Sequence, residues 1–96
     1  MRLSDLRPRW VTQDATRAGM GINFLCPCCM IEIIHVPFSN PLDGGAPFKD
    51  RFVLWERTGD TFENISLTPS IDASAVDASG KSHWHGWIRA GEVVDA

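Results

Sequence analysis

The chain has 96 residues, which is room for a single domain of ordinary size. Hydrophobic residues make up 44% and charged residues 22%, a balance typical of a folded globular domain and not of a disordered chain. The net charge is −3 and the nine basic residues are scattered, so we expect no nucleic-acid partner. The sequence carries no secretory signal and no apolar segment long enough to span a bilayer, which predicts a cytoplasmic protein without a membrane partner.

The first 20 residues show neither a helical nor a strand period, and Pro8 and Gly19 interrupt them. We predict an irregular N-terminal arm over residues 1–20. The one regular element considered for it is a short helix around residues 12–18.

From residue 21 onward, β-branched and aromatic residues form short runs separated by turn residues, which favours strands. These runs are 22–25, 30–36, 52–56, 62–67, 83–89 and 92–94. Segment 38–50 is rich in proline and glycine and segment 68–82 is small and polar, so both are expected to be surface loops. The predicted fold is one mainly β domain over residues 1–96, with a small β-rich α+β fold as the alternative.

The three cysteines are packed into four positions, Cys26, Cys28 and Cys29, after the first of these runs. Such close spacing makes a poor disulfide framework, whereas two thiolates in a Cys-x-x-Cys turn converge readily on one metal ion. Pro27 presets the backbone of that turn. The sequence therefore predicts half of a metal site at Cys26 and Cys29.

The second half of the site is predicted at His83 and His85. Two residues apart in a strand, these imidazoles leave the same face, and Trp84 leaves the other. The predicted site is Zn²⁺ bound by Cys26, Cys29, His83 and His85. The ion would clamp two distant hairpins together, giving hairpins linked by one zinc site.

Several alternatives to this closed site remain open. Buried cysteines without metal would explain the cluster, and Cys28 is able to replace one of the other ligands. His35 is expected to be a hydrogen-bonded sheet residue rather than a ligand. An open site with three ligands and a water would support hydrolysis, with Glu63 or Asp72 as the base.

Three segments carry a resemblance to a known family: 24–29 (FLCPCC), 62–72 (FENISLTPSID) and 83–93 (HWHGWIRAGEV). Together they resemble a small family of uncharacterised phage and prophage proteins that are often labelled ammonia monooxygenase. In that family a cysteine usually precedes, by three residues, the histidine that matches His85. Here this position is Ser82, so the resemblance leaves His83 or Cys28 as the fourth ligand.

The resemblance implies no settled function. The leading hypothesis is a non-enzymatic, zinc-stabilised phage or prophage accessory protein in the bacterial host cytoplasm, which presents a surface to an unidentified protein partner. Looser relatives accompany ubiquitin-like conjugation genes, where a peptidase role is suggested. The alternative function is thus a hydrolase or peptidase, working through an open zinc site or through Ser70 as nucleophile. Ser70 would need His35 or an unligated His83 as its base, and the competing interpretation is a rigid turn around Pro69.

Overall fold

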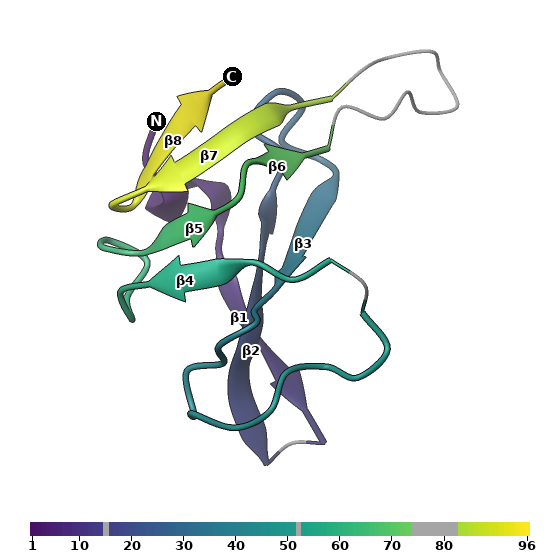
Figure 1. The fold of residues 1–96 in the computed structure, drawn as a ribbon. Coiled ribbons are helices and arrows are strands. Elements are labelled where there is room, and N and C mark those ends of the chain that lie inside the picture. The colour runs from purple at the N-terminus through teal and green to yellow at the C-terminus, as the bar shows by residue number, and fades with distance from the viewer. Residues whose placement is uncertain (15, 52, 74–82) are drawn as a thin grey trace.

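The computed structural model describes residues 1–14, 16–51, 53–73 and 83–96. Within them it contains eight strands in three sheets and one short 3-10 helix, Leu3–Leu6 (η1) (Figure 1). The prediction of a mainly β fold is confirmed. No helix in these residues combines the length and the apolarity needed to cross a bilayer.

The first sheet is antiparallel, with the order β1-β2-β3. Its strands are β1 (Arg9–Gln13), β2 (Arg17–Leu25) and β3 (Ile33–Pro37). The hairpin of β2 and β3 carries the three cysteines in its turn, as the sequence predicts.

The prediction of an irregular arm over residues 1–20 is wrong, because β1 and the start of β2 form a hairpin there. The register shifts between Val11, which pairs with Gly21, and Thr12, which pairs with Ala18. Two residues of β2 therefore lack a partner on β1. This bulge breaks the two-residue alternation by which a strand is recognised in sequence.

The remaining strands form two small antiparallel sheets, with the orders β4-β5 and β6-β7-β8. Their bounds are β4 (Glu56–Thr58), β5 (Ser66–Thr68), β6 (Ile71–Asp72), β7 (His85–Arg89) and β8 (Glu92–Asp95). The turn between β7 and β8 places Ala90 at φ 48° and Gly91 at φ 74°, the left-handed pair typical of a two-residue hairpin loop. This hairpin was predicted.

Two predicted strands lie elsewhere in the structure. The strand predicted at 52–56 is replaced by β4, which begins only at Glu56. The strand predicted at 62–67 is replaced by β5, which begins only at Ser66. The Asn64 side-chain oxygen accepts hydrogen bonds from the N–H groups of Asp60, at 3.1 Å, and Thr61, at 2.9 Å. This local capping turns the chain before β5, a preference of asparagine that competes with strand formation.

The two predicted loops have different outcomes. Residues 39–50 contain no helix or strand, in agreement with the prediction. The predicted loop 68–82 is corrected at its start, because β6 forms at Ile71–Asp72 and pairs with β7; residues 74–82 lie outside the described part of the chain.

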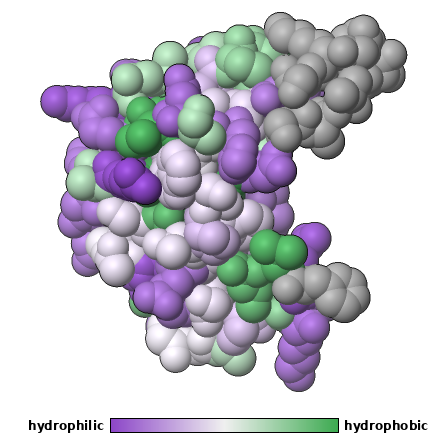
Figure 2. Space-filling view, turned by 45° about the horizontal axis from the view of Figure 1, so that its top comes forward, coloured by the Kyte–Doolittle hydropathy of each residue, from purple (hydrophilic) through white to green (hydrophobic). Residues whose placement is uncertain are grey.

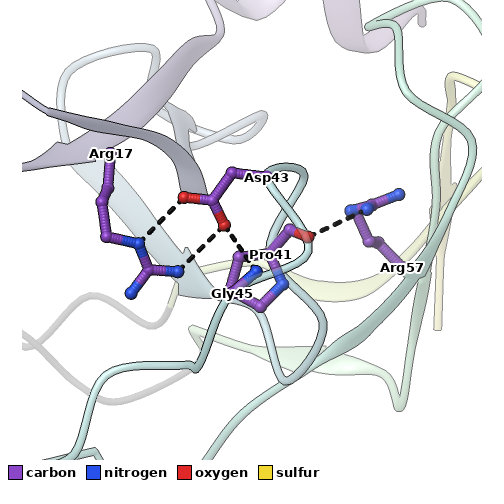
Figure 3. Close-up of polar contacts among 5 residues, drawn as sticks. All are labelled: Arg17, Pro41, Asp43, Gly45 and Arg57. Carbon is purple, nitrogen blue, oxygen red and sulfur yellow. Dashed lines mark hydrogen bonds and ion pairs between the residues drawn. The ribbon is translucent and has the colours of Figure 1, made fainter.

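The first loop is tied to its surroundings by arginine side chains (Figure 3). Arg17 donates to both carboxylate oxygens of Asp43 at 2.9 Å, and the N–H of Gly45 donates to the same carboxylate at 2.9 Å. On the other side, Arg57 of β4 donates to the carbonyl of Pro41 at 3.2 Å. The loop therefore connects β2 to β4 through polar contacts.

The bonds to Asp43 also change its ionisation. They lower the pKa of Asp43 from its ordinary 3.8 to about 2, and the hydrogen bond from Arg17 is the main cause.

The core lies where the first sheet crosses the other two (Figure 1). It consists of buried apolar side chains from the 3-10 helix, from all three sheets and from the segments beside them. They include Leu3, Leu6, Ile22, Phe24, Ile34, Val36, Phe38, Ile65, Leu67, Ile71, Trp84 and Ile88. The N-terminal segment is held against β8, with the Leu3 N–H donating to the Gly91 carbonyl at 2.8 Å. On the face shown in Figure 2, hydrophobic side chains form small separate patches among polar ones.

Candidate metal centre and serine site

The cysteines occupy a tight turn between β2 and β3. Cys26 follows the last residue of β2 and is buried, with its N–H donating to the Glu32 carbonyl at 2.8 Å. Its carbonyl accepts from the N–H of Met30 at 2.8 Å, and Met30 takes a left-handed φ of 59°. The Glu32 N–H points at the Cys29 sulfur, 3.4 Å away. This backbone geometry collects three sulfurs on one side of the turn.

The three sulfurs meet the imidazole of His83. The donor atoms of Cys26, Cys28, Cys29 and His83 all lie within 4.8 Å of one another. His83 Nδ1 is 3.8 Å from Cys26 Sγ and 3.5 Å from Cys28 Sγ, and these two sulfurs are 3.2 Å apart. Around a tetrahedral zinc, sulfurs would be about 3.8 Å apart and a sulfur and a nitrogen about 3.5 Å apart. The four residues thus fit a metal ion, and none of the cysteines is in a disulfide.

The thiol of Cys26 ionises more easily than an ordinary cysteine. Burial opposes the thiolate, but hydrogen bonds from the side chain and backbone of Cys28 and from the backbone of Trp84 and Cys29 outweigh it, and lower the pKa of Cys26 to about 6. A thiolate is the form that binds metal, so this environment prepares the site for a cation.

The structure brings together three of the four residues that the sequence predicts as ligands. Cys26, Cys29 and His83 lie in one cluster with Cys28, whereas His85 lies outside it. The prediction placed both histidines on one face of a strand, but β7 begins only at His85. His83 therefore precedes the strand and does not follow its alternation. Ser82, at the position where the resembling family has a cysteine, lies outside the described residues.

Trp84 separates the two histidines by entering the core. It is 6% exposed, packs edge-on against Phe24 with ring centroids 6.3 Å apart, and donates its indole N–H to Asp95 at 2.8 Å. The next residue but one, Gly86, has no room for a side chain, because a Cβ there would meet the Trp84 ring and the Val94 carbonyl. This packing fixes the start of β7 and the positions of the histidines on both sides of Trp84.

His85 faces Ser70 instead of the metal cluster. Ser70 stands between β5 and β6, and its Oγ is 3.2 Å from Nε2 of His85. The backbone carbonyl of Ser70 accepts a hydrogen bond from the indole N–H of Trp55 at 3.3 Å. Ser70 is therefore held through its main chain as well as through its side chain. A hydroxyl within hydrogen-bond reach of an imidazole is the arrangement of a serine nucleophile and its general base.

Asp72 lies on the same face as this pair. It is directly opposite His85 in the β6–β7 ladder. The Ala73 N–H donates to the Trp84 carbonyl at 2.9 Å, so these two residues form a hydrogen-bonded pair. Hydrogen-bonded and non-hydrogen-bonded pairs alternate along an antiparallel ladder, which makes Asp72 and His85 a non-hydrogen-bonded pair. The side chains of such a pair lie closer together than those of a hydrogen-bonded pair. Ser70 is two residues before Asp72 and so projects to the same side. A serine, a histidine and a carboxylate are thereby grouped at one sheet edge.

A comparison with known families agrees with this chemistry. A family described as "Bacterial ubiquitination-like system serine protease (BubE)" matches residues 2–96. The chain belongs to this family. No curated protein and no solved structure shows a significant match.

This family assignment agrees with one part of the resemblance, the link of looser relatives to ubiquitin-like conjugation genes with a suggested peptidase role. The sequence predicts His35 or His83 as the imidazole beside Ser70, whereas the imidazole next to Ser70 in the structure is that of His85. The pairing was missed because residues 68–82 were predicted to be a loop. The β-branched Ile71 beside Asp72 was the available signal for a short strand.

His35 has a structural role in the first sheet. Its Nδ1 is 2.6 Å from the side-chain oxygen of Asn23, its direct partner across the β2–β3 ladder. Its Nε2 is buried and has no hydrogen-bond partner among the described residues. Burial, and secondarily the charge of Arg51, lowers the pKa of His35, which favours the neutral form of the ring. It lies outside the cluster of potential metal ligands, as expected of a sheet histidine.

The two carboxylates considered as bases for an open metal site are separated by the fold. Asp72 lines a cavity of about 450 Å³ together with Cys26 and His83. Glu63 lines a different cavity, with Arg2 and Gly91. Of these two candidates, Asp72 alone shares a cavity with residues of the metal cluster.

Proposed function

We propose that this chain is a serine peptidase that acts in a bacterial ubiquitination-like system. The observation that carries the proposal is the 3.2 Å approach of Ser70 Oγ to His85 Nε2, in a chain whose family is described as serine proteases. Ser70 is the nucleophile, His85 the general base and Asp72 the carboxylate that orients the imidazole.

In this proposal each group has a defined task. His85 Nε2 accepts the hydroxyl proton while Ser70 Oγ forms a bond to the carbonyl carbon of the substrate. The resulting imidazolium then gives this proton to the leaving group as the old bond breaks. Water repeats the sequence on the acyl-enzyme and regenerates Ser70. Asp72 stabilises the imidazolium because it stands directly opposite His85 in the ladder.

The test is covalent labelling and hydrolysis with Ser70→Ala. The wild-type protein is expected to react with a fluorophosphonate probe at Ser70 and to cleave a reporter from the C-terminus of a ubiquitin-like protein. Ser70→Ala should not be labelled and should lose on the order of a thousandfold or more in kcat/KM. Labelling elsewhere, or unchanged cleavage by Ser70→Ala, would contradict the assignment.

The metal cluster supports a structural role for zinc. Three sulfurs and one imidazole nitrogen are the donor set zinc prefers, and four protein ligands leave no coordination position for water. This arrangement favours the serine over the open-zinc alternative for hydrolysis. Metal analysis of protein purified without chelators is expected to find one zinc per chain, and another metal or none would refute this.

The non-enzymatic interpretation is the second candidate. It is supported by the same closed donor set, which would stabilise a small domain without taking part in chemistry. In it the chain is a phage or prophage accessory protein that binds a protein partner in the host cytoplasm, where reduced cysteines persist. An unreactive Ser70, together with a partner captured equally by wild type and Ser70→Ala, would favour it.

A further inference from the structure

The outward face of β7 carries a row of three side chains that begins at the proposed base. β7 is the central strand of its sheet, between β6 and β8 (Figure 1). His85, Trp87 and Arg89 alternate along it with two buried residues, so the row lies on the side away from the core. On this same side Ser70 meets His85. The row therefore extends along β7 from the proposed catalytic pair.

Ring contacts join the members of this row. The ring centroids of His85 and Trp87 are 6.4 Å apart, with an angle of 28° between the ring planes. The guanidinium carbon of Arg89 lies 4.7 Å from the centroid of the Trp87 ring, a distance typical of a cation–π contact. Such a contact uses the face of the guanidinium and leaves the N–H donors in its plane available. Trp87 thus holds a cation in place beside the catalytic pair.

The charge of Arg89 is not used by the fold. Arg89 is exposed, and within the described part of the chain it makes no ion pair. Glu92 stands directly opposite it in the β7–β8 ladder, but the Glu92 carboxylate pairs with Arg2 at 3.6 Å. A guanidinium binds a carboxylate through two parallel hydrogen bonds, so the donors of Arg89 suit a ligand that brings its own carboxylate.

We propose that Trp87 and Arg89 form a substrate subsite of the peptidase. The subsite binds an acidic side chain of an extended peptide, roughly three or four residues before the scissile bond. This inference rests on the proposed peptidase function, and it adds a substrate class to it. The indole supplies a flat apolar surface for the peptide and the guanidinium supplies selectivity for the acidic side chain.

The chemistry of the proposed mechanism sets the position of the acidic residue. His85 gives its proton to the leaving group, so the leaving group lies toward His85. The acyl part of the substrate extends the other way, past Trp87 to Arg89. At a rise of about 3.3 Å per residue, Arg89 lies about 13 Å along β7 from His85. An extended substrate covers this distance with a similar number of its own residues.

The experiment uses acetyl-hexapeptide aminocoumarins with an alanine background, in which aspartate or lysine stands at each position in turn. Arg89→Glu and Trp87→Leu are compared with Arg9→Glu. Arg9 is an exposed arginine of β1, in a different sheet, so Arg9→Glu makes the same change of charge away from the site. Zinc content and melting temperature are measured for every variant, to confirm that the fold is intact.

The wild type is expected to prefer aspartate to lysine by about tenfold in kcat/KM at the third or fourth residue before the bond. Arg89→Glu should reverse this preference, which loss of stability alone would not do. Trp87→Leu should weaken it, because the guanidinium loses its support, and so should high salt. Arg9→Glu should show the wild-type preference.

A fluorophosphonate probe separates the two proposals, since it reacts with an activated serine without reaching Arg89. If wild-type Ser70 is not labelled, the peptidase function fails and the subsite fails with it. If Ser70 is labelled but the wild type does not distinguish aspartate from lysine, or Arg89→Glu keeps the wild-type preference, the subsite assignment is overturned and the peptidase function stands.

Discussion

At the scale of single residues, two neighbouring histidines have different surroundings. His83 Nδ1 lies 3.5 Å from the Cys28 sulfur, whereas His85 Nε2 lies 3.2 Å from the Ser70 hydroxyl. Trp84, buried between them, holds each imidazole at its own site. The pair therefore allows metal binding and catalysis to be tested separately, at positions two residues apart.

We expect substitutions of the two histidines to affect different properties of the protein. His83→Gln should lose zinc and melt at a lower temperature, because it removes the one nitrogen donor of the cluster. His85→Gln should keep its zinc and its melting temperature but lose on the order of a thousandfold in kcat/KM, because it removes the proposed base. Metal analysis, thermal melts and peptide hydrolysis measure the three quantities. Zinc loss in His85→Gln would show that His85 is a ligand after all.

A third residue, Trp55, holds the proposed nucleophile Ser70 through its indole N–H. Trp55→Phe keeps a ring at this site but removes the bond to the Ser70 carbonyl. We expect a loss of roughly 1 kcal/mol in the free energy of unfolding and of up to about tenfold in kcat, with slower fluorophosphonate labelling of Ser70. Chemical denaturation and labelling kinetics measure these effects. Unchanged labelling would mean that Ser70 is held by its own turn.

At the scale of elements, short strands depend on contacts made by the segments between them. The sheet β4-β5 has only three residues in each strand, and the loop 39–50 reaches β4 through Arg57 and β2 through Arg17. A strand of three residues has few ladder bonds of its own, so such side-chain ties contribute to its position. The Arg17–Asp43 pair is the part of this tie that responds to pH.

Because the pKa of Asp43 is lowered to about 2 in the folded protein, the carboxylate contributes stability above its ordinary pKa of 3.8. This contribution falls as the pH drops from 3.8 and is lost once the pH passes below about 2. We therefore expect Asp43→Asn to be less stable than wild type at pH 7, and the difference in urea midpoint to shrink between pH 4 and pH 2. High salt should also reduce it, since the pair is partly exposed. A difference independent of pH would assign the effect to packing of the loop.

At the scale of the whole molecule, the metal cluster connects parts that are remote in sequence. Its sulfurs come from the turn between β2 and β3, and its imidazole precedes β7 in another sheet. A domain of this size has a small core, so a link of this kind adds substantially to its stability. The same link holds β7, and with it His85, against the remainder of the fold.

If the cluster holds zinc and the chain is a peptidase, as proposed, removal of the zinc should affect both stability and catalysis. A strong chelator is expected to lower the melting temperature by more than about 10 °C, because ligand binding to the folded state contributes several kcal/mol. Peptide cleavage should fall in parallel and return when zinc is added back. Differential scanning calorimetry and a hydrolysis assay follow the two effects. A melting temperature that chelation leaves unchanged would refute the structural role of the metal.

The local parts of this protein could be predicted from its sequence. The cysteine turn after a strand, the Ala90-Gly91 hairpin and the mainly β character each depend on residues close together in the chain, and the structure agrees with them. The assignment of His83 and His85 could not be predicted in this way, because it depends on where β7 begins. That start is set by Trp84 entering the core and by the pairing of His85 with Asp72, which are contacts between distant segments. The approach of Ser70 to His85 likewise exists only once β6 and β7 pair, so tertiary structure alone decided which histidine serves the metal cluster and which faces the serine.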